Sequence, residues 1–315
     1  MKTYQLKILK DFLQRYYINA REVKWIGSGW FSDAYKFTFN NSTYVFRINS
    51  FKTDFEKDQL AAVRFNSPKI PVPVVRGIGN FSEDLFYCIT DFQQGYTLHQ
   101  IRKRYGVKGE LKLVPQLLHS LEKIHGLCTD EYPGWGLTNA QGTGRFASWT
   151  DFLTAPSEEK TTLNATADLS CMTPYENLLG QLRAHMFSFL AFLPERKCVL
   201  HGDFRNGNLL IQSGKIAAVL DWAEMSLGDP LYDIVTMETP WEEEHVPYTS
   251  LWKKASERVG RLEPFFEERV TCYRIHRAIF EIEAHALFNK PDIAKKIAAW
   301  AEKKLRSPQR SVVSY

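Results

Sequence analysis

This sequence of 315 residues has few cysteines, a small net charge and no long apolar run. Its five cysteines are scattered without a C-x-x-C pair, which indicates reduced thiols rather than a disulfide framework or a zinc site. The net charge of +4 is too small to indicate nucleic-acid binding by itself. The most apolar stretch, residues 186–193, is far shorter than the roughly 20 residues that span a bilayer, and the start of the chain lacks the apolar run of a signal peptide. We therefore expect a cytoplasmic protein with no nucleic-acid or membrane partner.

The hydrophobic pattern changes from strand-like to helical along the chain. Tyr35, Phe37 and Phe39 alternate with polar residues, as in a half-buried strand, and Asn40-Asn41 indicates a hairpin turn. The expected strands are 23–26, 34–39, 43–49 and 85–92. The expected helices are 3–18, 54–65, 117–125, 175–193 and 266–304, with a surface helix start at 242–245. The pattern predicts an α+β fold of two lobes, a small β-rich N-lobe over residues 1–93 and a larger, mainly helical C-lobe over residues 94–315.

The strongest chemical signal is a polar loop between two apolar strand-like runs. Asp203 and Asn208 lie in HGDFRNGNLL, and Asp221 follows the apolar run IAAVL. A hairpin of this length brings Asn208 and Asp221 together beside Asp203. A Mg²⁺ ion that contacts nucleotide phosphates needs a carboxylate and an amide oxygen as ligands. A separate carboxylate is needed to accept the proton of the attacking hydroxyl. We interpret Asn208 and Asp221 as metal ligands and Asp203 as the catalytic base.

These motifs resemble the aminoglycoside phosphotransferase family, relatives of protein kinases that phosphorylate hydroxyl groups of small molecules. The family pattern H-G-D-x-x-x-x-N, and the D-W and G-D-P motifs after it, are matched by His201, Gly202, Asp203, Asn208, Asp221-Trp222 and residues 228–230. The resemblance covers roughly residues 20–300 and is closest to the hygromycin B phosphotransferase branch. It implies a protein-kinase-like bilobal fold, with a small antiparallel sheet in the N-lobe. It also implies structural roles for His201 and Asp229 around the catalytic loop.

The resemblance implies a nucleotide site in the N-lobe and its connector. The segment GSGWFSD resembles a phosphate-binding glycine loop in which Ser32 stands at the third glycine position, and Arg47 stands where kinases carry a lysine. Either Glu56 or Asp58 is expected to pair with Arg47, and Asp58 is favoured. The residues expected to bind ATP, or GTP in its place, are Gly27, Ser28, Gly29, Ser32, Arg47, Asp58, Asp91, Phe92 and Gln93.

The acceptor is expected to meet acidic and aromatic residues after the metal motif. The expected substrate residues are Asp203, Glu224, Trp241, Glu242, Glu243 and Glu281. Carboxylates pair with ammonium groups and accept bonds from sugar hydroxyls, which favours an aminoglycoside such as hygromycin B or a related natural product. The spacing of Arg277, Glu281 and His285 is also that of a solvated helix face.

The predicted activity is therefore an ATP- and Mg²⁺-dependent phosphotransfer to an alcohol group, in antibiotic resistance or self-protection. A metabolite kinase for a sugar or amino alcohol stays open, and so does a catalytically inactive nucleotide-binding regulator. The absence of G-x-x-x-x-G-K-[ST] excludes a P-loop kinase, and no D-F-G to A-P-E segment of a protein kinase follows Asp221. A monomer or weak homodimer is expected.

Overall fold

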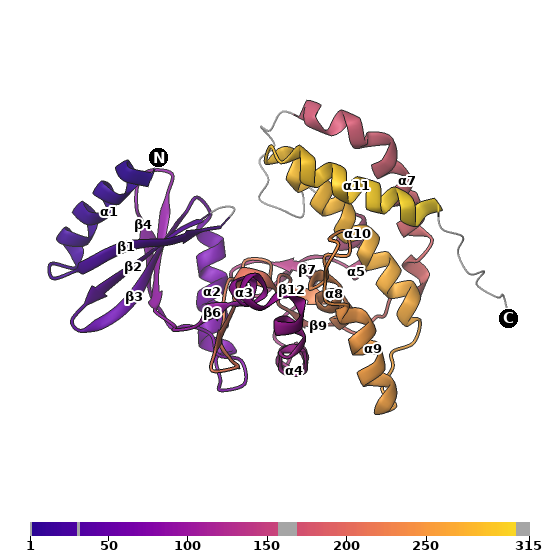
Figure 1. Ribbon diagram of the computed structural model, residues 1–315, viewed down its shortest axis with the longest axis horizontal. Helices are drawn as coiled ribbons and strands as arrows, with labels where there is room; N and C mark the ends of the chain where they lie inside the picture. Colours follow the sequence, from indigo (N-terminus) through magenta and orange to yellow (C-terminus); the bar gives the residue numbers. More distant parts are fainter. Residues whose placement is uncertain (1, 30–31, 157–168, 307–315) are drawn as a thin grey trace. The chain divides into compact units, whose positions relative to one another are not determined.

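The structure is a computed structural model that describes residues 2–29, 32–156 and 169–306 (Figure 1). Its residue contacts divide the chain into two compact units. The first unit consists of Met1–Leu127, Thr138–Thr143 and Asp203–Met225. The second consists of Cys128–Leu137, Gly144–Gly202 and Ser226–Tyr315. Each unit combines separate chain segments, and the lobes expected at 1–93 and 94–315 stay a prediction.

A five-stranded antiparallel sheet forms the N-terminal part of the first unit, in the order β1-β2-β3-β5-β4. Its strands are β1 (Arg21–Ser28), β2 (Ser32–Phe39), β3 (Ser42–Asn49), β4 (Val75–Asn80) and β5 (Phe86–Asp91). Asn40 and Asn41 join β2 to β3 with φ angles of 47° and 61°. Two left-handed residues give the turn that matches the twist of a tight hairpin, so the hairpin predicted from Asn40-Asn41 is confirmed.

The two faces of this sheet have different partners. Helix α1 (Lys2–Tyr16) packs through Leu9 and Leu13 on Phe46 and Ile48, which are all buried. Side chains of a strand alternate between its faces, so Arg47 of β3 lies on the side opposite Phe46 and Ile48. Helix α2 (Lys52–Arg64) contacts β4 and β5. One face of the sheet is thus an apolar core, and the other presents a cation toward α2.

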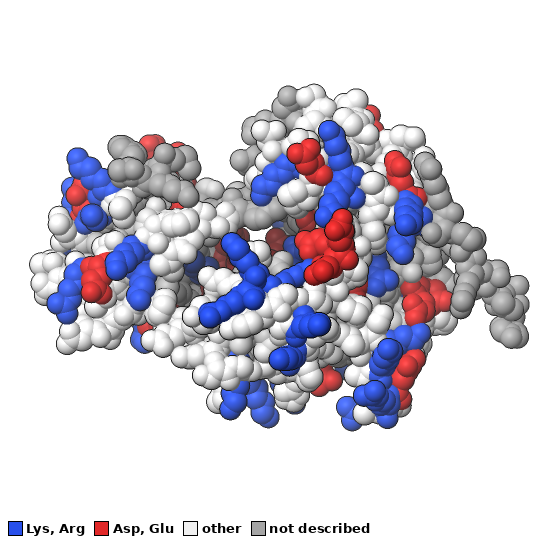
Figure 2. Space-filling view, viewed as in Figure 1, with Lys and Arg blue, Asp and Glu red and all other residues white. Residues whose placement is uncertain are grey.

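A second, three-stranded sheet in the order β11-β10-β6 follows in the first unit. It consists of β6 (Tyr96–Thr97), β10 (Leu209–Gln212) and β11 (Lys215–Val219), next to helices α3 (Leu98–Leu111) and α4 (Val114–His125). Thr97 and Gln100 cap α3 reciprocally, which fixes where the helix begins. Lys and Arg side chains gather over α3 in Figure 2, and elsewhere on this face both signs are interspersed. The net positive charge is therefore not concentrated in one broad basic face in this view.

The second unit contains a four-stranded sheet in the order β8-β7-β12-β9 and most of the helices. Its strands are β7 (Trp135–Thr138), β8 (Gly144–Phe146), β9 (Cys198–Leu200) and β12 (Ser226–Gly228). Its helices are α5 (Trp149–Thr154), α7 (Glu176–Phe187), α8 (Pro230–Thr236), α9 (Tyr248–Arg258), α10 (Phe266–Leu287) and α11 (Pro291–Arg306). A Cβ at Gly228 would lie 2.4 Å from the Trp149 ring, so a side chain at this position of the G-D-P motif would displace the indole.

Three helix predictions for the second unit were wrong in detail. The helix expected over 175–193 ends at Phe187. Residues 242–244 form a bend, and the helix begins only at Tyr248, directly after Pro247. The helical stretch expected over 266–304 is divided into α10 and α11, because Asn289 has a left-handed φ of 54° and Pro291 opens the next helix. Among the described residues no helix is both long and apolar enough to cross a membrane.

Candidate active site

The catalytic loop begins directly after β9, and its backbone is held by an acidic side chain. Asp233 of α8 is fully buried and accepts hydrogen bonds from the amides of His201 at 3.0 Å and Gly202 at 2.8 Å. Gly202 has a φ of 83°, a conformation that favours glycine. His201 is itself fully buried, as its expected structural role requires. The entry into the loop is therefore anchored immediately before Asp203.

Asp203 lies in the first unit, with a hydrogen-bond donor on each of its carboxylate oxygens. Arg205 Nε donates to Oδ1 at 2.6 Å, and Asn208 Nδ2 donates to Oδ2 at 2.8 Å. Asn208 Nδ2 also donates to the Asp203 carbonyl at 3.0 Å. These contacts fix the direction of the carboxylate, and they use only the nitrogen of the Asn208 side chain. The close approach of Asp203 and Asn208 expected from the sequence is present.

Asp221 follows β11 with a left-handed φ of 60°, and it is open to a cavity rather than enclosed. The protein packed around that cavity desolvates the carboxylate, and this desolvation, together with the charges of Asp58, Asp203 and Asp54, raises the pKa of Asp221 to about 7, although Arg47 opposes the shift. Negative charge is therefore in excess here, and a cation would stabilise it. An amide oxygen and a carboxylate are ligands that Mg²⁺ accepts, so Asn208 and Asp221 fit the expected metal.

No complete metal site made only of protein side chains accompanies this pair. Within residues 2–29, 32–156 and 169–306, no group of three or more His, Cys, Asp or Glu side chains is arranged to hold an ion. Mg²⁺ at nucleotide sites is usually held by one or two carboxylates plus phosphates and water. The sparse donor set is the one expected for a metal that arrives with a nucleotide.

Asp58 of α2 joins Arg47 of β3 to residues 221–223, which are called the metal loop because they begin with the expected metal ligand Asp221. One of its oxygens forms an ion pair with Arg47, and the other accepts from the Trp222 amide at 2.8 Å. Glu56, the alternative partner, instead pairs with Lys52 at 3.1 Å. Burial disfavours the charged form of Arg47, but the charge and hydrogen bond of Asp58 outweigh it and raise the pKa of Arg47. Arg47 is thus a permanent cation held in place, not an exposed strand residue.

These groups line a cavity of about 330 Å³ that lies entirely within the first unit. Its lining includes Ile26, Ala34, Val45, Arg47, Asp58, Asp91, Phe92, Gln93, Gly207, Leu210 and Asp221. Apolar residues from both sheets of the unit form much of the wall, and the charged groups lie together at Arg47, Asp58 and Asp221. This arrangement suits a nucleotide whose planar base lies between the apolar walls and whose phosphates lie toward the charged residues.

The connector and the glycine loop contribute to this cavity unequally. Asp91 is committed to Arg76 through two bonds of 2.7 Å, and the amides of Asp91 and Phe92 donate to Val74 and Thr43. Of the expected connector residues Asp91, Phe92 and Gln93, only Gln93 has an amide that takes no part in these contacts. The four expected glycine-loop residues Gly27, Ser28, Gly29 and Ser32 do not line the cavity, and the loop is closed by a 2.7 Å bond from the Gly29 amide to the Ser32 carbonyl.

The expected acceptor residues are divided between the two units. Glu224 is half-buried in the first unit. In the second unit, Glu242 and Glu243 are exposed, and Trp241 packs edge-on against Trp300, with 5.8 Å between ring centres. The carboxylate of Glu281 is 4% exposed, and Arg277 at 2.8 Å and His285 at 3.3 Å lie against it. The interpretation of this helix face as solvated was therefore wrong.

Asp229 lies in a buried hydrogen-bond network at the start of α8. It is fully buried, caps α8 by accepting from the Leu231 amide, and receives two bonds from Arg269, at 2.8 and 2.6 Å. The Tyr273 hydroxyl also donates to it. Burial, followed by the charge of Asp229, raises the pKa of Tyr273, so this phenol stays protonated.

Two residues of the first unit were missed by sequence reasoning. Lys57 is buried next to Asp58 and donates to the Ala223 carbonyl at 2.5 Å, so α2 holds the metal loop through two consecutive residues. Nothing in a local pattern links Lys57 to Ala223. Arg205 lies inside the motif itself, and its cationic side chain two residues after Asp203 was the available signal.

Comparison with known proteins gives consistent matches. The model of a family described as a phosphotransferase enzyme family matches residues 22–249, which is more than half of the chain. A hygromycin-B 4-O-kinase from Escherichia coli is 29% identical over 241 residues, covering 74% of this chain and 67% of that relative.

Solved structures match the fold over nearly the whole chain. A thermostable mutant of the aminoglycoside phosphotransferase APH(4)-Ia, in ternary complex with ADP and hygromycin B, has a TM-score of 0.82 and 22% identity, covering 96% of this chain and 99% of that one. The GDP and kanamycin complex of APH(2")-IIia has a TM-score of 0.58 and 15% identity, covering 94% and 97%. The protein-kinase-like fold predicted from the sequence is confirmed.

Proposed function

The chain belongs to the phosphotransferase enzyme family, and on that premise we propose that it transfers the γ-phosphoryl group of ATP to a hydroxyl of an aminoglycoside or related natural product. The observation that carries the proposal is the placement of Asp203, Asn208 and Asp221 in one compact unit with a cavity of about 330 Å³. The 29% identity to a hygromycin-B 4-O-kinase supports hygromycin B as the first acceptor to test. Resistance or self-protection is the corresponding biological role.

The nucleotide would occupy the cavity of the first unit. The connector at Asp91, Phe92 and Gln93 would face the base, and Arg47 would direct its remaining donors toward the phosphates. The ion pair with Asp58 supports this role because it limits the rotamers of a long side chain. Gly27, Ser28, Gly29 and Ser32 would cover the phosphates, with hydroxyl or backbone groups as donors.

Mg²⁺ would be held by the side-chain oxygen of Asn208 and the carboxylate of Asp221. When bound, it neutralises charge on the phosphate oxygens. For the protein, the consequence lies in Asp221, because a nearby cation favours the ionised carboxylate and opposes the effects that raise its pKa. Lys57 and Asp58 would keep the metal loop in place through Ala223 and Trp222.

Asp203 would accept a hydrogen bond from the acceptor hydroxyl and orient its oxygen toward the γ-phosphorus. As the new O–P bond forms, the bond from phosphorus to the β–γ bridging oxygen breaks and ADP leaves. The hydroxyl proton passes to the Asp203 carboxylate. Arg205 and Asn208 hold that carboxylate in one orientation, so positioning and proton acceptance are combined in one side chain.

The acceptor would be recognised by Glu224, Trp241, Glu242, Glu243 and Glu281. The exposed Glu242 and Glu243 are the strongest of these for attracting a polycationic acceptor. Glu281 is already neutralised by its helix neighbours, so its contribution would be through the shape and rigidity of α10. A cytoplasmic monomer or weak homodimer, and a choice of ATP over GTP, stay predictions.

The test is acceptor-dependent ADP release by the purified chain, with hygromycin B, other aminoglycosides, simple sugars and amino alcohols. We expect turnover with an aminoglycoside and a product heavier by one phosphoryl group. Turnover confined to a sugar or amino alcohol would show a metabolite kinase. Nucleotide binding without release of ADP for any acceptor would show a regulator.

A further inference from the structure

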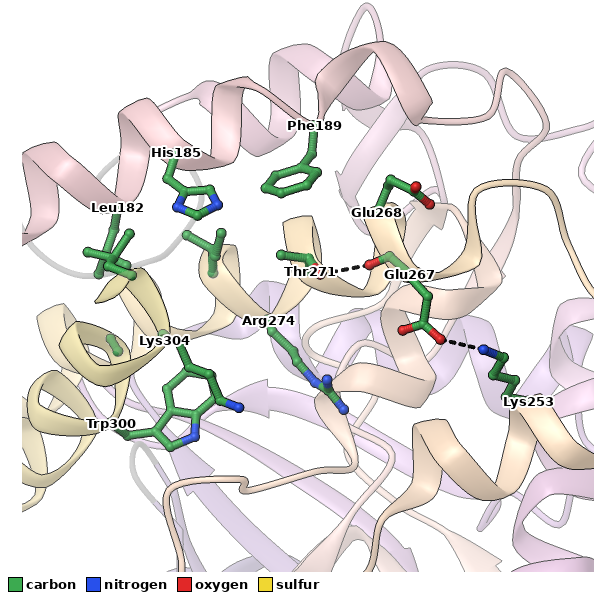
Figure 3. Close-up of a pocket in the computed structure, with 14 residues that line it drawn as sticks. Leu182, His185, Phe189, Lys253, Glu267, Glu268, Thr271, Arg274, Trp300 and Lys304 are labelled. Atoms are coloured by element: carbon green, nitrogen blue, oxygen red, sulfur yellow. Dashed lines mark hydrogen bonds and ion pairs between the residues drawn. The ribbon is translucent and has the colours of Figure 1, made fainter. Parts of the chain in front are cut away.

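The second unit contains a cavity of about 660 Å³ between helices α7, α9, α10 and α11. Figure 3 shows this pocket with the side chains that line it. It is lined by the N-terminal half of α10 and the C-terminal half of α11, together with α7 and one residue of α9. None of the residues expected to bind nucleotide, metal or acceptor lines it. Its volume is in the range of small-molecule sites.

Flat aromatic surfaces stand on two sides of this cavity. The rings of His185, in α7, and Phe189, two residues after α7 ends, are stacked, with 5.2 Å between centres and 18° between planes. Trp300 of α11 supplies an indole, and Figure 3 shows it across the pocket from these two rings. Burial lowers the pKa of His185, so near neutral pH this ring adds a flat surface rather than a charge. Two ring-bearing walls favour a planar ligand.

The polar groups of the cavity offer more donors than acceptors. Glu267 is paired with Lys253 at 2.6 Å. Arg274 uses one terminal nitrogen for Glu238 and Thr249, at 2.7 and 2.6 Å. Its side chain lines the cavity and is 33% exposed, which leaves the other terminal nitrogen for a further acceptor. A guanidinium N–H that faces the cavity can donate a charge-assisted hydrogen bond to an anionic group there.

Lys304 adds an exposed ammonium group to the same wall as Trp300. The lining then carries Lys253, Arg274 and Lys304 together with Glu267 and Glu268. Lys253 is paired with Glu267, and Arg274 is paired with Glu238 outside the lining. Arg274 and Lys304 are thus the lining cations that are not paired with a lining carboxylate, and they favour a ligand with a single negative charge.

We propose that this cavity is a second ligand site, which binds a planar aromatic molecule that carries one carboxylate or sulfonate group. The ring lies between Trp300 and the rings of His185 and Phe189, and the anionic group accepts hydrogen bonds from Arg274 and Lys304. The site takes a different chemical class from the acceptor of the phosphotransfer reaction, and it does not depend on the identity of that acceptor.

The probe is anilinonaphthalene sulfonate, whose fluorescence rises in an apolar site, titrated into the full chain with the nucleotide site saturated by Mg²⁺ and a non-hydrolysable ATP analogue. We expect one saturable site. Lys304→Glu should weaken the probe about fivefold, whereas Lys303→Glu, on the same helix but outside the cavity lining, should leave it unchanged. Thr271→Trp should abolish binding by filling the pocket.

Urea unfolding of each variant checks that the fold is retained, and if Thr271→Trp does not fold, the Lys304→Glu and Lys303→Glu pair decides. Equal titrations for these two variants would overturn the proposal. Equal affinity for the neutral analogue N-phenylnaphthylamine would overturn the assignment of an anion. Displacement of the probe by hygromycin B would show that the cavity is an acceptor site instead.

Discussion

The two units of this protein differ in how far their carboxylates are balanced by cations. In the first, Arg47 pairs with Asp58 and Arg205 pairs with Asp203, but burial together with the charge of Asp58 still raises the pKa of Asp221 to about 7. In the second, several buried acids have a cation beside them, in the pairs Asp229–Arg269, Glu281–Arg277 and Glu283–Arg183. Excess negative charge beside a cavity indicates a place for a cation, whereas balanced pairs indicate scaffold.

The largest expected effect is on the carboxylate that receives the acceptor proton. Asp203→Asn keeps the size of the side chain but removes its capacity to take a proton. We expect kcat to fall by about 10² to 10⁴, with nucleotide affinity changed little, measured by coupled ADP release and by calorimetry with ADP. Turnover of the Asn variant at the wild-type rate would show that Asp203 is not the base.

The next largest effect tests a balanced pair. Arg269→Met leaves Asp229 fully buried and without its cation, which should lower the free energy of unfolding by about 3–5 kcal/mol. The measurement is urea denaturation followed by circular dichroism. Asp229→Asn combined with Arg269→Met removes both charges and should recover part of the loss. A single variant as stable as the wild type would contradict a structural role for the pair.

Arg47→Lys should separate charge from geometry at the phosphate end of the cavity. Lysine keeps the positive charge, but it cannot both hold Asp58 and direct a planar fork toward phosphate. We expect KM for ATP to rise about tenfold, with a smaller change in kcat. The matched control is Arg76→Lys, because Arg76 also pairs with an aspartate but its side chain is 53% exposed, and that exchange should change KM little.

The smallest effect is a pH dependence of metal-assisted binding. Because the pKa of Asp221 is raised, much of this carboxylate is protonated and uncharged at pH 6, and it becomes ionised by pH 8. Mg²⁺ needs the ionised form, so the ratio of ADP affinities with and without Mg²⁺ should increase about tenfold from pH 6 to pH 8. The same ratio measured for Asp221→Asn at both pH values gives the part of the increase that comes from the nucleotide alone. An equal increase in this variant would contradict the role of Asp221.

Sequence reasoning was most successful where a feature is local in the chain. The Asn40-Asn41 hairpin and the contact of Asp203 with Asn208 depend on residues a few positions apart, so a local sequence pattern is enough to predict them. The partner of Arg47 was narrowed to Glu56 or Asp58 because both lie in α2, which directly follows β3. The protein-kinase-like fold followed from motifs whose order and spacing match a family.

Features that depend on long-range packing were not predictable in this way. Lys57 and Ala223 are 166 positions apart, and only the folded chain places them together. The periodicity of Arg277 and Glu281 is the same for a solvated and a buried helix face, and α10 is buried because α7 and α11 pack on it. The helix start expected at Glu242 failed because Pro247 delays the helix, and its local charge pattern gave no sign of this.

The contrast between the two units is tested most directly by urea unfolding of metal-free Asp221→Asn and Asp229→Asn, measured side by side at pH 8. Removing the charge of Asp221 relieves repulsion, because its raised pKa means that the ionised form is disfavoured in the folded chain. Asp221→Asn should therefore be at least as stable as the wild type. Asp229→Asn removes the fully buried counter-charge of Arg269 and leaves only the more distant Glu263 at 3.5 Å, so this variant should be less stable by several kcal/mol. Equal losses of stability in both variants would contradict the account.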